Sequence, residues 1–159
     1  MTAPPDAALP EARRIALRLA YEGTRYSGWQ MQPGRPTVQG TLAEAIREVS
    51  GEDVVPKGAS RTDAGVHALD QVAAFTSTSG HPAHVWVRAL NARLPPDVAV
   101  REGREVGPEF DPVSAAIRKR YRYRIHDAVW RPVLDRHLVW RWRATGSSTT
   151  WCGSSPARW

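Results

Sequence analysis

The spacing of apolar residues changes along this chain from every second position to every third or fourth position. Between residues 15 and 21, isoleucine, leucine and tyrosine alternate with alanine and arginine, as in a strand with one buried face. A glycine-rich stretch follows. Apolar residues then recur at helical spacing, which predicts an amphipathic helix over about 38–50. These two periods in succession predict a strand followed by a helix.

Residues 53–106 continue the alternation of short strands and helices. Apolar clusters predict strands near 53–59 and 70–76, a helix over about 81–94, and a strand around 97–106. The resulting order, βαββαβ, is typical of the ferredoxin-like fold of the α/β (α+β) class. We therefore expect two helices on one face of an open antiparallel sheet, with the other face free as a floor for RNA.

We expect four segments along the chain. Residues 1–12 are rich in proline and alanine and predict a disordered leader. Residues 13–107 form the ferredoxin-like half, and residues 108–143 contain a link and the start of a second, similar domain that is incomplete. At 120–126, aromatic and apolar residues alternate with arginines, which predicts the first strand of that second domain. Residues 144–159 form an atypical tail.

The tail, ATGSSTTWCGSSPARW, has no aliphatic periodicity, although it contains two tryptophans and the single cysteine of the chain, Cys152. Its composition resembles that of GC-rich DNA translated out of frame. We therefore expect a frameshift or premature end near Arg143, and a genuine flexible tail is the alternative. One cysteine excludes an internal disulfide and leaves a cysteine-based metal site without partners.

The chain is basic, with a formal net charge of +6, and all but two of its 22 basic residues are arginine. Arginine side chains match phosphate oxygens and stack on bases, so the charge indicates an anionic partner. Codon usage that favours arginine is the alternative explanation. The sequence has no apolar run long enough for a membrane span and no secretory signal at its start, so we expect a cytoplasmic protein.

The segment Ser60-Arg61-Thr62-Asp63-Ala64-Gly65-Val66-His67-Ala68 is the strongest candidate for chemistry. It places Asp63 two residues after Arg61, in a glycine-containing turn between two expected strands. On local sequence alone, Asp-x-Gly is more typical of a turn in which the carboxylate binds nearby backbone amides. Ser60, His67 and Asp70 include the residue types of a hydrolytic triad, but no nucleophile elbow surrounds the serine.

Two further patterns favour structural explanations. His81 and His84 lie three residues apart without a cysteine or acidic ligand at a suitable spacing, which favours a surface pair over a metal site. Several tryptophans are candidates for stacking on RNA bases, although burial in a core or interface is the more typical role; these are Trp29, Trp130, Trp140 and Trp142.

The segment SRTDAGVHA resembles GRTDAGVHA, the catalytic segment of the TruA family of tRNA pseudouridine synthases. Further stretches agree in the same order: YEGTRYSGWQMQ with TVQGTL, then QVAAF, then NARLPPDV, and then Phe110 followed by the RYRYRI strand. Together they extend over about 14–125. Ordered matches over this length are far more specific than a single motif.

The resemblance implies that the protein is an isomerase that converts uridine to pseudouridine at positions 38–40 of the tRNA anticodon stem-loop. It implies catalytic roles for Asp63, Arg61 and Tyr121, with Asp63 as the nucleophile. The Arg61 guanidinium is expected to hold that carboxylate ionised and to occupy the space left by the flipped base. Tyr121 is expected to stack on the uracil or to assist removal of the C5 proton. No redox step occurs, so neither a cofactor nor a metal is implied. The resemblance also suggests tRNA as the partner and a homodimer. Further substrate-binding candidates are Arg120, Arg122 and Arg124.

The chain departs from the family pattern in two places. Ser60 replaces the first glycine of the motif, and Phe110-Asp111-Pro112-Val113 stands where the family commonly has an arginine, as in FHAR. We also expect the C-terminal half of the family fold, which supplies part of the cleft and of the dimer interface, to be missing here. The alternative function is therefore a truncated, catalytically inactive remnant that still binds RNA.

Overall fold

The computed structural model describes residues 11–126, 128, 130–134, 136–138 and 140–141. The chain divides into two compact units, residues 1–115 and 116–159. Most of the expected leader and all of the expected tail lie outside the described residues.

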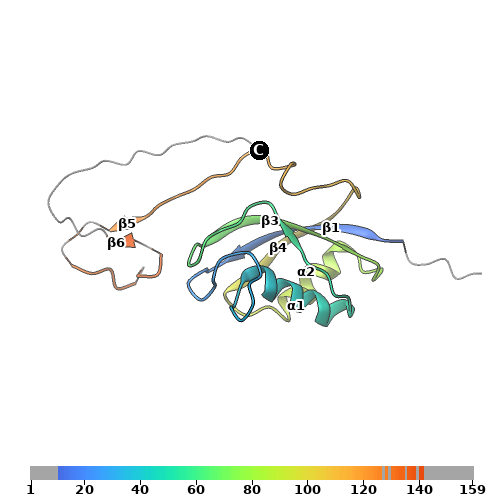
Figure 1. Cartoon of the computed structure of the whole chain (residues 1–159), viewed down its shortest axis with the longest axis horizontal. Coiled ribbons are helices and arrows are strands. Elements are labelled where there is room, and N and C mark those ends of the chain that lie inside the picture. The colour runs from blue at the N-terminus through green and yellow to red at the C-terminus, as the bar shows by residue number, and fades with distance from the viewer. Residues whose placement is uncertain (1–10, 127, 129, 135, 139, 142–159) are drawn as a thin grey trace, which may run out of the picture. The chain divides into compact units, whose positions relative to one another are not determined.

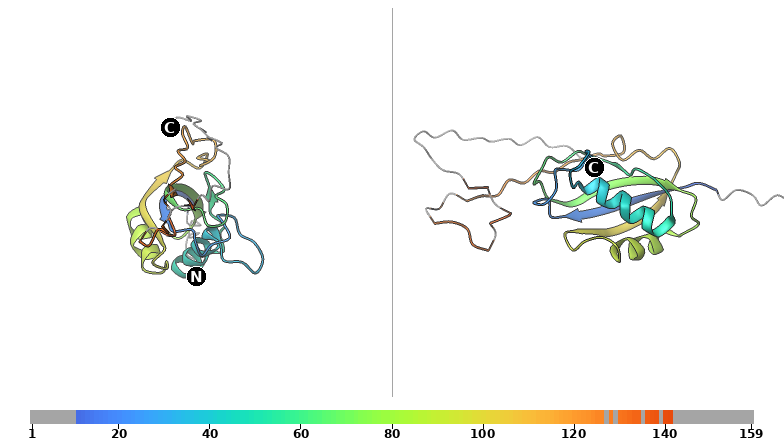
Figure 2. Two further views of the ribbon diagram at one scale, coloured as in Figure 1. Left: turned by 90° about the vertical axis from the view of Figure 1, so that its left-hand side faces the viewer. Right: turned by 60° about the horizontal axis from the view of Figure 1, so that its bottom comes forward.

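The first unit has the predicted order of elements (Figure 1). These are β1 (Arg13–Tyr21), α1 (Val38–Ser50), β2 (Lys57–Gly58), β3 (Ala68–Ser77), α2 (Ala83–Asn91) and β4 (Val98–Val106). The strands form one antiparallel sheet in the order β2-β3-β1-β4. Both helices lie side by side on the same face of the sheet (Figure 2). This arrangement confirms the predicted ferredoxin-like α+β fold.

The core lies between the sheet and the two helices. β1 presents Ile15, Leu17 and Leu19 to it, each no more than 1% exposed. From α2, the indole of Trp86 meets the ring of Phe75 edge to face, with centroids 5.0 Å apart. The alternating burial along β1 confirms the strand pattern predicted for 15–21.

Capping residues and a proline set the limits of two elements. The Thr37 hydroxyl accepts a hydrogen bond from the Gly40 amide at 3.2 Å and begins α1, and Gly51 ends it with a φ of 76°. The strand predicted over 53–59 is shorter, because β2 contains only Lys57 and Gly58. Pro56 has no amide hydrogen for the ladder, so pairing with β3 begins after it.

The face of the sheet opposite the helices is partly covered by residues 110–112, which we call the crossing segment. Arg14 of β1 donates from Nε to the Phe110 carbonyl at 2.6 Å. Lys57 of β2 forms an ion pair with Asp111. The crossing segment therefore passes over β3, which lies between those strands, and Pro112 in it is fully buried. The expectation that this face is free is therefore wrong where the crossing segment lies, near Arg14 and Lys57.

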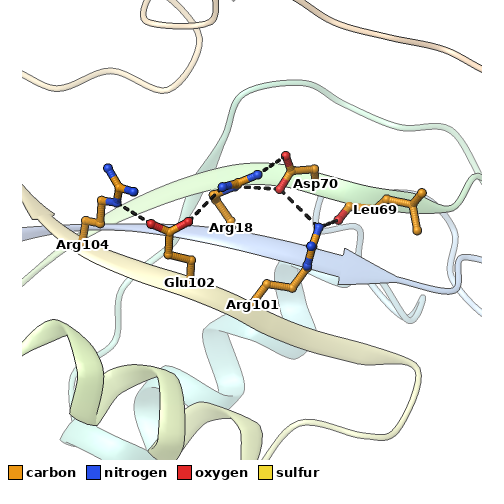
Figure 3. A network of polar contacts seen from close by, with 6 residues as sticks. All are labelled: Arg18, Leu69, Asp70, Arg101, Glu102 and Arg104. Atoms are coloured by element: carbon orange, nitrogen blue, oxygen red, sulfur yellow. Dashed lines mark hydrogen bonds and ion pairs between the residues drawn. The ribbon is translucent and has the colours of Figure 1, made fainter.

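The other end of the same face carries a network of opposite charges (Figure 3). Arg18 donates to Asp70 at 2.7 Å and to Glu102 at 2.9 Å, and Arg104 pairs with Glu102. The hydrogen bonds from Arg18 lower the pKa of the Asp70 carboxyl. Arg101 adds a bond to the Leu69 carbonyl at 2.8 Å. On this sheet face, carboxylates thus neutralise much of the positive charge that a surface binding RNA would be expected to carry.

The second unit is described only in part. Ile125–His126 (β5) pairs in parallel with Trp140–Arg141 (β6). The strand predicted over 120–126 is wrong for residues 120–124, which form no strand. A strand needs a partner for its backbone groups. Within 120–126, only Ile125 and His126 have such a partner among the described residues. Neither helix of the described chain has the length and apolar character that a bilayer crossing requires.

Candidate active site

The expected catalytic segment forms the loop between β2 and β3, residues 59–67, which we call the Asp63 loop. It begins where the Ala59 amide donates to the Val72 carbonyl at 2.8 Å. Ser60, which replaces the family's glycine, is accommodated by Gln71. Its hydroxyl lies 3.1 Å from the Gln71 side-chain oxygen, and its carbonyl accepts from the Gln71 amide at 2.5 Å. The substitution therefore leaves the loop anchored to β3.

The tip of the Asp63 loop is a tight turn. The Val66 amide donates to the Asp63 carbonyl at 3.1 Å, and Gly65 has a φ of 78°, which glycine adopts without strain. The Asp-x-Gly turn expected from local sequence is therefore present. The carboxylate was expected to bind nearby backbone amides, but the Asp63 side chain makes no hydrogen bond or ion pair with any described residue. The carboxylate is exposed and available to a ligand.

A second loop, residues 22–36, packs its backbone directly on the Asp63 loop. A methyl group placed on Gly28 would lie 2.5 Å from the Thr62 carbonyl oxygen, and one on Gly23 would lie 2.0 Å from the Val66 carbonyl oxygen. Next to Gly28, the Trp29 amide donates to the Thr62 carbonyl at 2.9 Å. Only glycine allows so close an approach, so the two loops form one rigid support for Asp63.

Side chains from the start of the 22–36 loop and the end of β1 complete the support. The hydroxyls of Tyr21 and Thr62 are 2.8 Å apart, and the Gly23 amide donates to His67 Nδ1 at 3.1 Å. The Tyr26 hydroxyl donates to Asp97 at 2.7 Å. Burial, followed by the bond to that carboxylate, raises the pKa of Tyr26 to about 12. Tyr26 therefore remains a hydrogen-bond donor throughout the physiological range.

The two loops enclose a cleft of about 350 Å³. Its lining residues are Ser27, Gln30, Gln32, Arg35, Arg61, Thr62, Asp63 and Ala64. The volume lies at the lower end of the range for small-molecule sites, which suits a single nucleoside. Arg61 and Asp63 share this cleft but form no ion pair with each other. The role predicted for Arg61 in holding the carboxylate ionised stays a prediction.

The remaining predicted site residues belong to the second unit. Tyr121 is 64% exposed, and the three candidate substrate-binding arginines are also exposed. Those arginines are Arg120, Arg122 and Arg124. Their roles at the Asp63 cleft stay predictions.

The alternative triad is not assembled. Ser60 bonds to Gln71, His67 accepts from the Gly23 amide, and Asp70 pairs with Arg18 on the sheet face. Trp29 is 2% exposed and belongs to the core, as predicted. Trp130 is 67% exposed, so the burial predicted for it is wrong. Within the part of the chain that the structure describes, no cluster of three or more histidine, cysteine, aspartate or glutamate side chains could hold a metal ion.

Sequence analysis missed one wall of the cleft. The cleft-lining residues of this wall come from the glycine-rich stretch between β1 and α1. That stretch contributed to the family resemblance but was not predicted to line the site. These residues are Ser27, Gln30, Gln32 and Arg35. The available signal was the stretch itself, which combines glycines with uncharged polar residues and arginine. A long glycine-rich connection of this kind often carries a functional loop.

The fold and the cleft together define an α+β half-domain that presents one exposed aspartate to a ligand the size of a nucleoside. The family model described as tRNA pseudouridine synthase matches residues 19–113. The chain is 44% identical over 131 residues to tRNA pseudouridine synthase A of Moorella thermoacetica, covering 81% of this chain and 53% of the relative.

The protein of the same name from Myxococcus xanthus is 46% identical over 127 residues, covering 80% of this chain and 48% of that protein. The chain belongs to the tRNA pseudouridine synthase family. It spans about half the length of the curated relatives that it matches.

Proposed function

We propose that this chain acts in the isomerisation of uridine to pseudouridine in tRNA, with Asp63 as the nucleophilic carboxylate. The observation that carries the proposal is the exposed, unpaired Asp63 carboxylate in a nucleoside-sized cleft, on a loop held by the 22–36 loop. A carboxylate can act as a nucleophile without a separate base, which suits Asp63 to this role.

The reaction is balanced without a redox partner. The bond between N1 of uracil and C1′ of ribose breaks, the base rotates, and a bond between C5 and C1′ forms. The proton on C5 is lost and N1 gains a proton. The base must leave the helical stack for this to happen, and Arg61, which lines the cleft, would occupy the space that it vacates. Tyr121 is proposed to contact the extruded uracil.

We further propose that the substrate uridines lie at positions 38–40 of the anticodon stem-loop, and that the active protein is a cytoplasmic homodimer. The family membership supports both points. The proposed substrate-binding arginines of the second unit would add phosphate contacts on the stem; they are Arg120, Arg122 and Arg124.

Tritium release from tRNA that carries C5-tritiated uridine tests the function directly. We expect release by the 159-residue chain, none by Asp63→Asn, and nearly unchanged tRNA affinity in that variant, because the amide removes the nucleophile but few phosphate contacts. Asp53→Asn is the matched control, since Asp53 is 91% exposed and lies outside the cleft. It should retain full release.

The alternative function, an inactive RNA-binding remnant, is favoured by one observation: the chain spans about half of its relatives' length. The same experiment separates the two. A folded chain that binds tRNA but releases no tritium would establish the remnant. Release that persists in Asp63→Asn would show that another residue is the nucleophile.

A further inference from the structure

Most arginines of the first unit already have partners within the protein. Seven pair with carboxylates, namely Arg13, Arg18, Arg25, Arg47, Arg93, Arg101 and Arg104. Arg14 and Arg101 donate to backbone carbonyls. A guanidinium with a carboxylate beside it must lose that partner, or share it, before it can bind a phosphate. These side chains are therefore weak candidates for RNA contact.

The exceptions within residues 11–115 are Arg35, Arg61 and Arg88, which make no side-chain hydrogen bond or ion pair with any described residue. Arg35 and Arg61 both line the Asp63 cleft. Arg88 lies on α2 and does not line it. Two of the three unpaired arginines among these described residues thus line the cleft that also contains the unpaired carboxylate of Asp63.

The position of Arg35 is fixed by a short hairpin. The Ser27 amide donates to the Pro36 carbonyl at 2.8 Å, and the Arg35 amide donates to the Gln32 carbonyl at 3.3 Å. The Gln32 side chain donates to the Ser27 carbonyl at 3.0 Å, and Gly34 supplies the turn with a φ of 69°. The backbone that carries the free guanidinium is therefore ordered before any ligand binds, which lowers the entropic cost of contact.

We propose that Arg35 binds a phosphate of the RNA backbone next to the nucleotide that enters the Asp63 cleft. The inference rests on the proposed function and deepens it. When a base is extruded, it enters the pocket while its phosphates stay at the rim, where a charged donor can hold them. Arg35 lines the cleft from the 22–36 loop and Arg61 lines it from the Asp63 loop. Two unpaired cations that line one cleft suit a polyanionic strand.

The test measures tRNA affinity of the full chain as a function of KCl concentration, for the native protein, Arg35→Gln and Arg88→Gln. Loss of one phosphate contact should reduce the slope of log K against log salt by about 0.7–0.9 and weaken binding about two- to tenfold near 0.1 M salt. Arg88→Gln, which also removes one unpaired arginine, should change neither quantity. Arg35→Lys should restore the slope, because it restores the charge.

An anticodon stem-loop RNA with uncharged methylphosphonates flanking the target uridine locates the contact. These linkages should weaken binding to the native chain but cause no further loss in Arg35→Gln. Equal losses in both proteins, or an Arg35→Gln slope equal to that of Arg88→Gln, would overturn the assignment of Arg35. Failure of the chain to bind tRNA at all would overturn the proposed function as well. If the chain released no tritium but Arg35→Gln still reduced the salt slope, the proposed function would fail and this inference would stand.

Discussion

At the scale of single residues, the position of Asp63 depends on glycines whose lack of a side chain lets two loops approach closely. Gly28 contacts the backbone of Thr62 and Asp63 and has a φ of 89°, so both its missing side chain and its backbone conformation matter. Gly51, at the end of α1, has a similar φ of 76°, but a methyl group there would meet nothing within 4 Å. Alanine substitutions at Gly28 and Gly51 therefore share the backbone strain, and only the substitution at Gly28 adds a steric clash.

We expect Gly28→Ala to reduce tritium release far more than Gly51→Ala. Both alanines are strained by positive φ, at a cost of about 1–2 kcal/mol each. Only the alanine at position 28 must also push the Thr62 carbonyl away and move the carboxylate beside it. Urea unfolding of both variants gives the stability change, and release at saturating tRNA gives the effect on turnover. Equal activity losses in the two variants would contradict the proposed support of the Asp63 loop.

The sequence predicted which residue carries the chemistry but not what holds it. Asp63 could be identified because its neighbours form a specific motif, and its turn followed from the glycine two positions later. The contact between Gly28 and Thr62 could not be identified, because it depends on how two loops far apart in the sequence meet in space. The absence of an ion pair between Arg61 and Asp63 also depends on side-chain placement, which spacing along the chain does not determine.

At the scale of elements, the sheet face opposite the helices is stabilised by charges that belong to three neighbouring strands. Arg18 on β1 lies between Asp70 on β3 and Glu102 on β4, which Figure 3 shows in one view. Hydrogen bonds from Arg18 lower the pKa of Asp70, and those from Arg104 and then Arg18 lower the pKa of Glu102. Pairing across strands therefore links the stability of the sheet to pH.

We expect the native chain to lose stability as the pH falls below about 4, and Arg18→Gln to lose less over the same range. Asp70 has a folded pKa below its ordinary value of 3.8, so its contribution is present above that value and is lost as the pH falls through the folded pKa. At pH 7 the variant should be less stable by no more than about 1 kcal/mol, because the Arg18–Asp70 pair is nearly half exposed.

Urea unfolding at several pH values between 2 and 7 measures this difference. Arg88→Gln is the control and should follow the native pH profile. If Arg18→Gln followed it too, the network would contribute nothing to stability in acid.

Long elements with one clear period were predictable, and short ones were not. The bounds of α1 and β4 agree with the predictions to within a residue or two. Burial recurs at helical spacing along α1 and alternates over the first residues of β4. β2 depends on one proline and on its partner β3, and residues 120–124 have alternating side chains but no partner strand among the described residues. Periodicity indicates which residues suit a strand, whereas pairing decides whether a strand forms.

At the scale of the whole molecule, the buried hydrophobic core that the described residues form comes from positions between 15 and 100. The crossing segment adds the buried Pro112, the ion pair of Asp111 with Lys57, and the bond from Arg14 to Phe110. The departure from the family's FHAR pattern thus has a structural consequence, because Asp111 holds the crossing segment to β2. The unit that ends at Ala115 therefore includes both its hydrophobic core and the crossing segment that covers part of the open sheet face.

Two shortened chains test where this unit ends. A chain that stops after Ala115 keeps every one of these contacts, so we expect it to unfold cooperatively in urea at the midpoint of the full chain. A chain that stops after Val106 loses the crossing segment and exposes the surface around Ala74, which is otherwise 1% exposed. It should be less stable by about 1.5–3 kcal/mol, the amount expected for uncovering a buried side chain. If both shortened chains were equally stable, the crossing segment would add nothing to the fold; if neither folded, the first unit would depend on residues beyond 115.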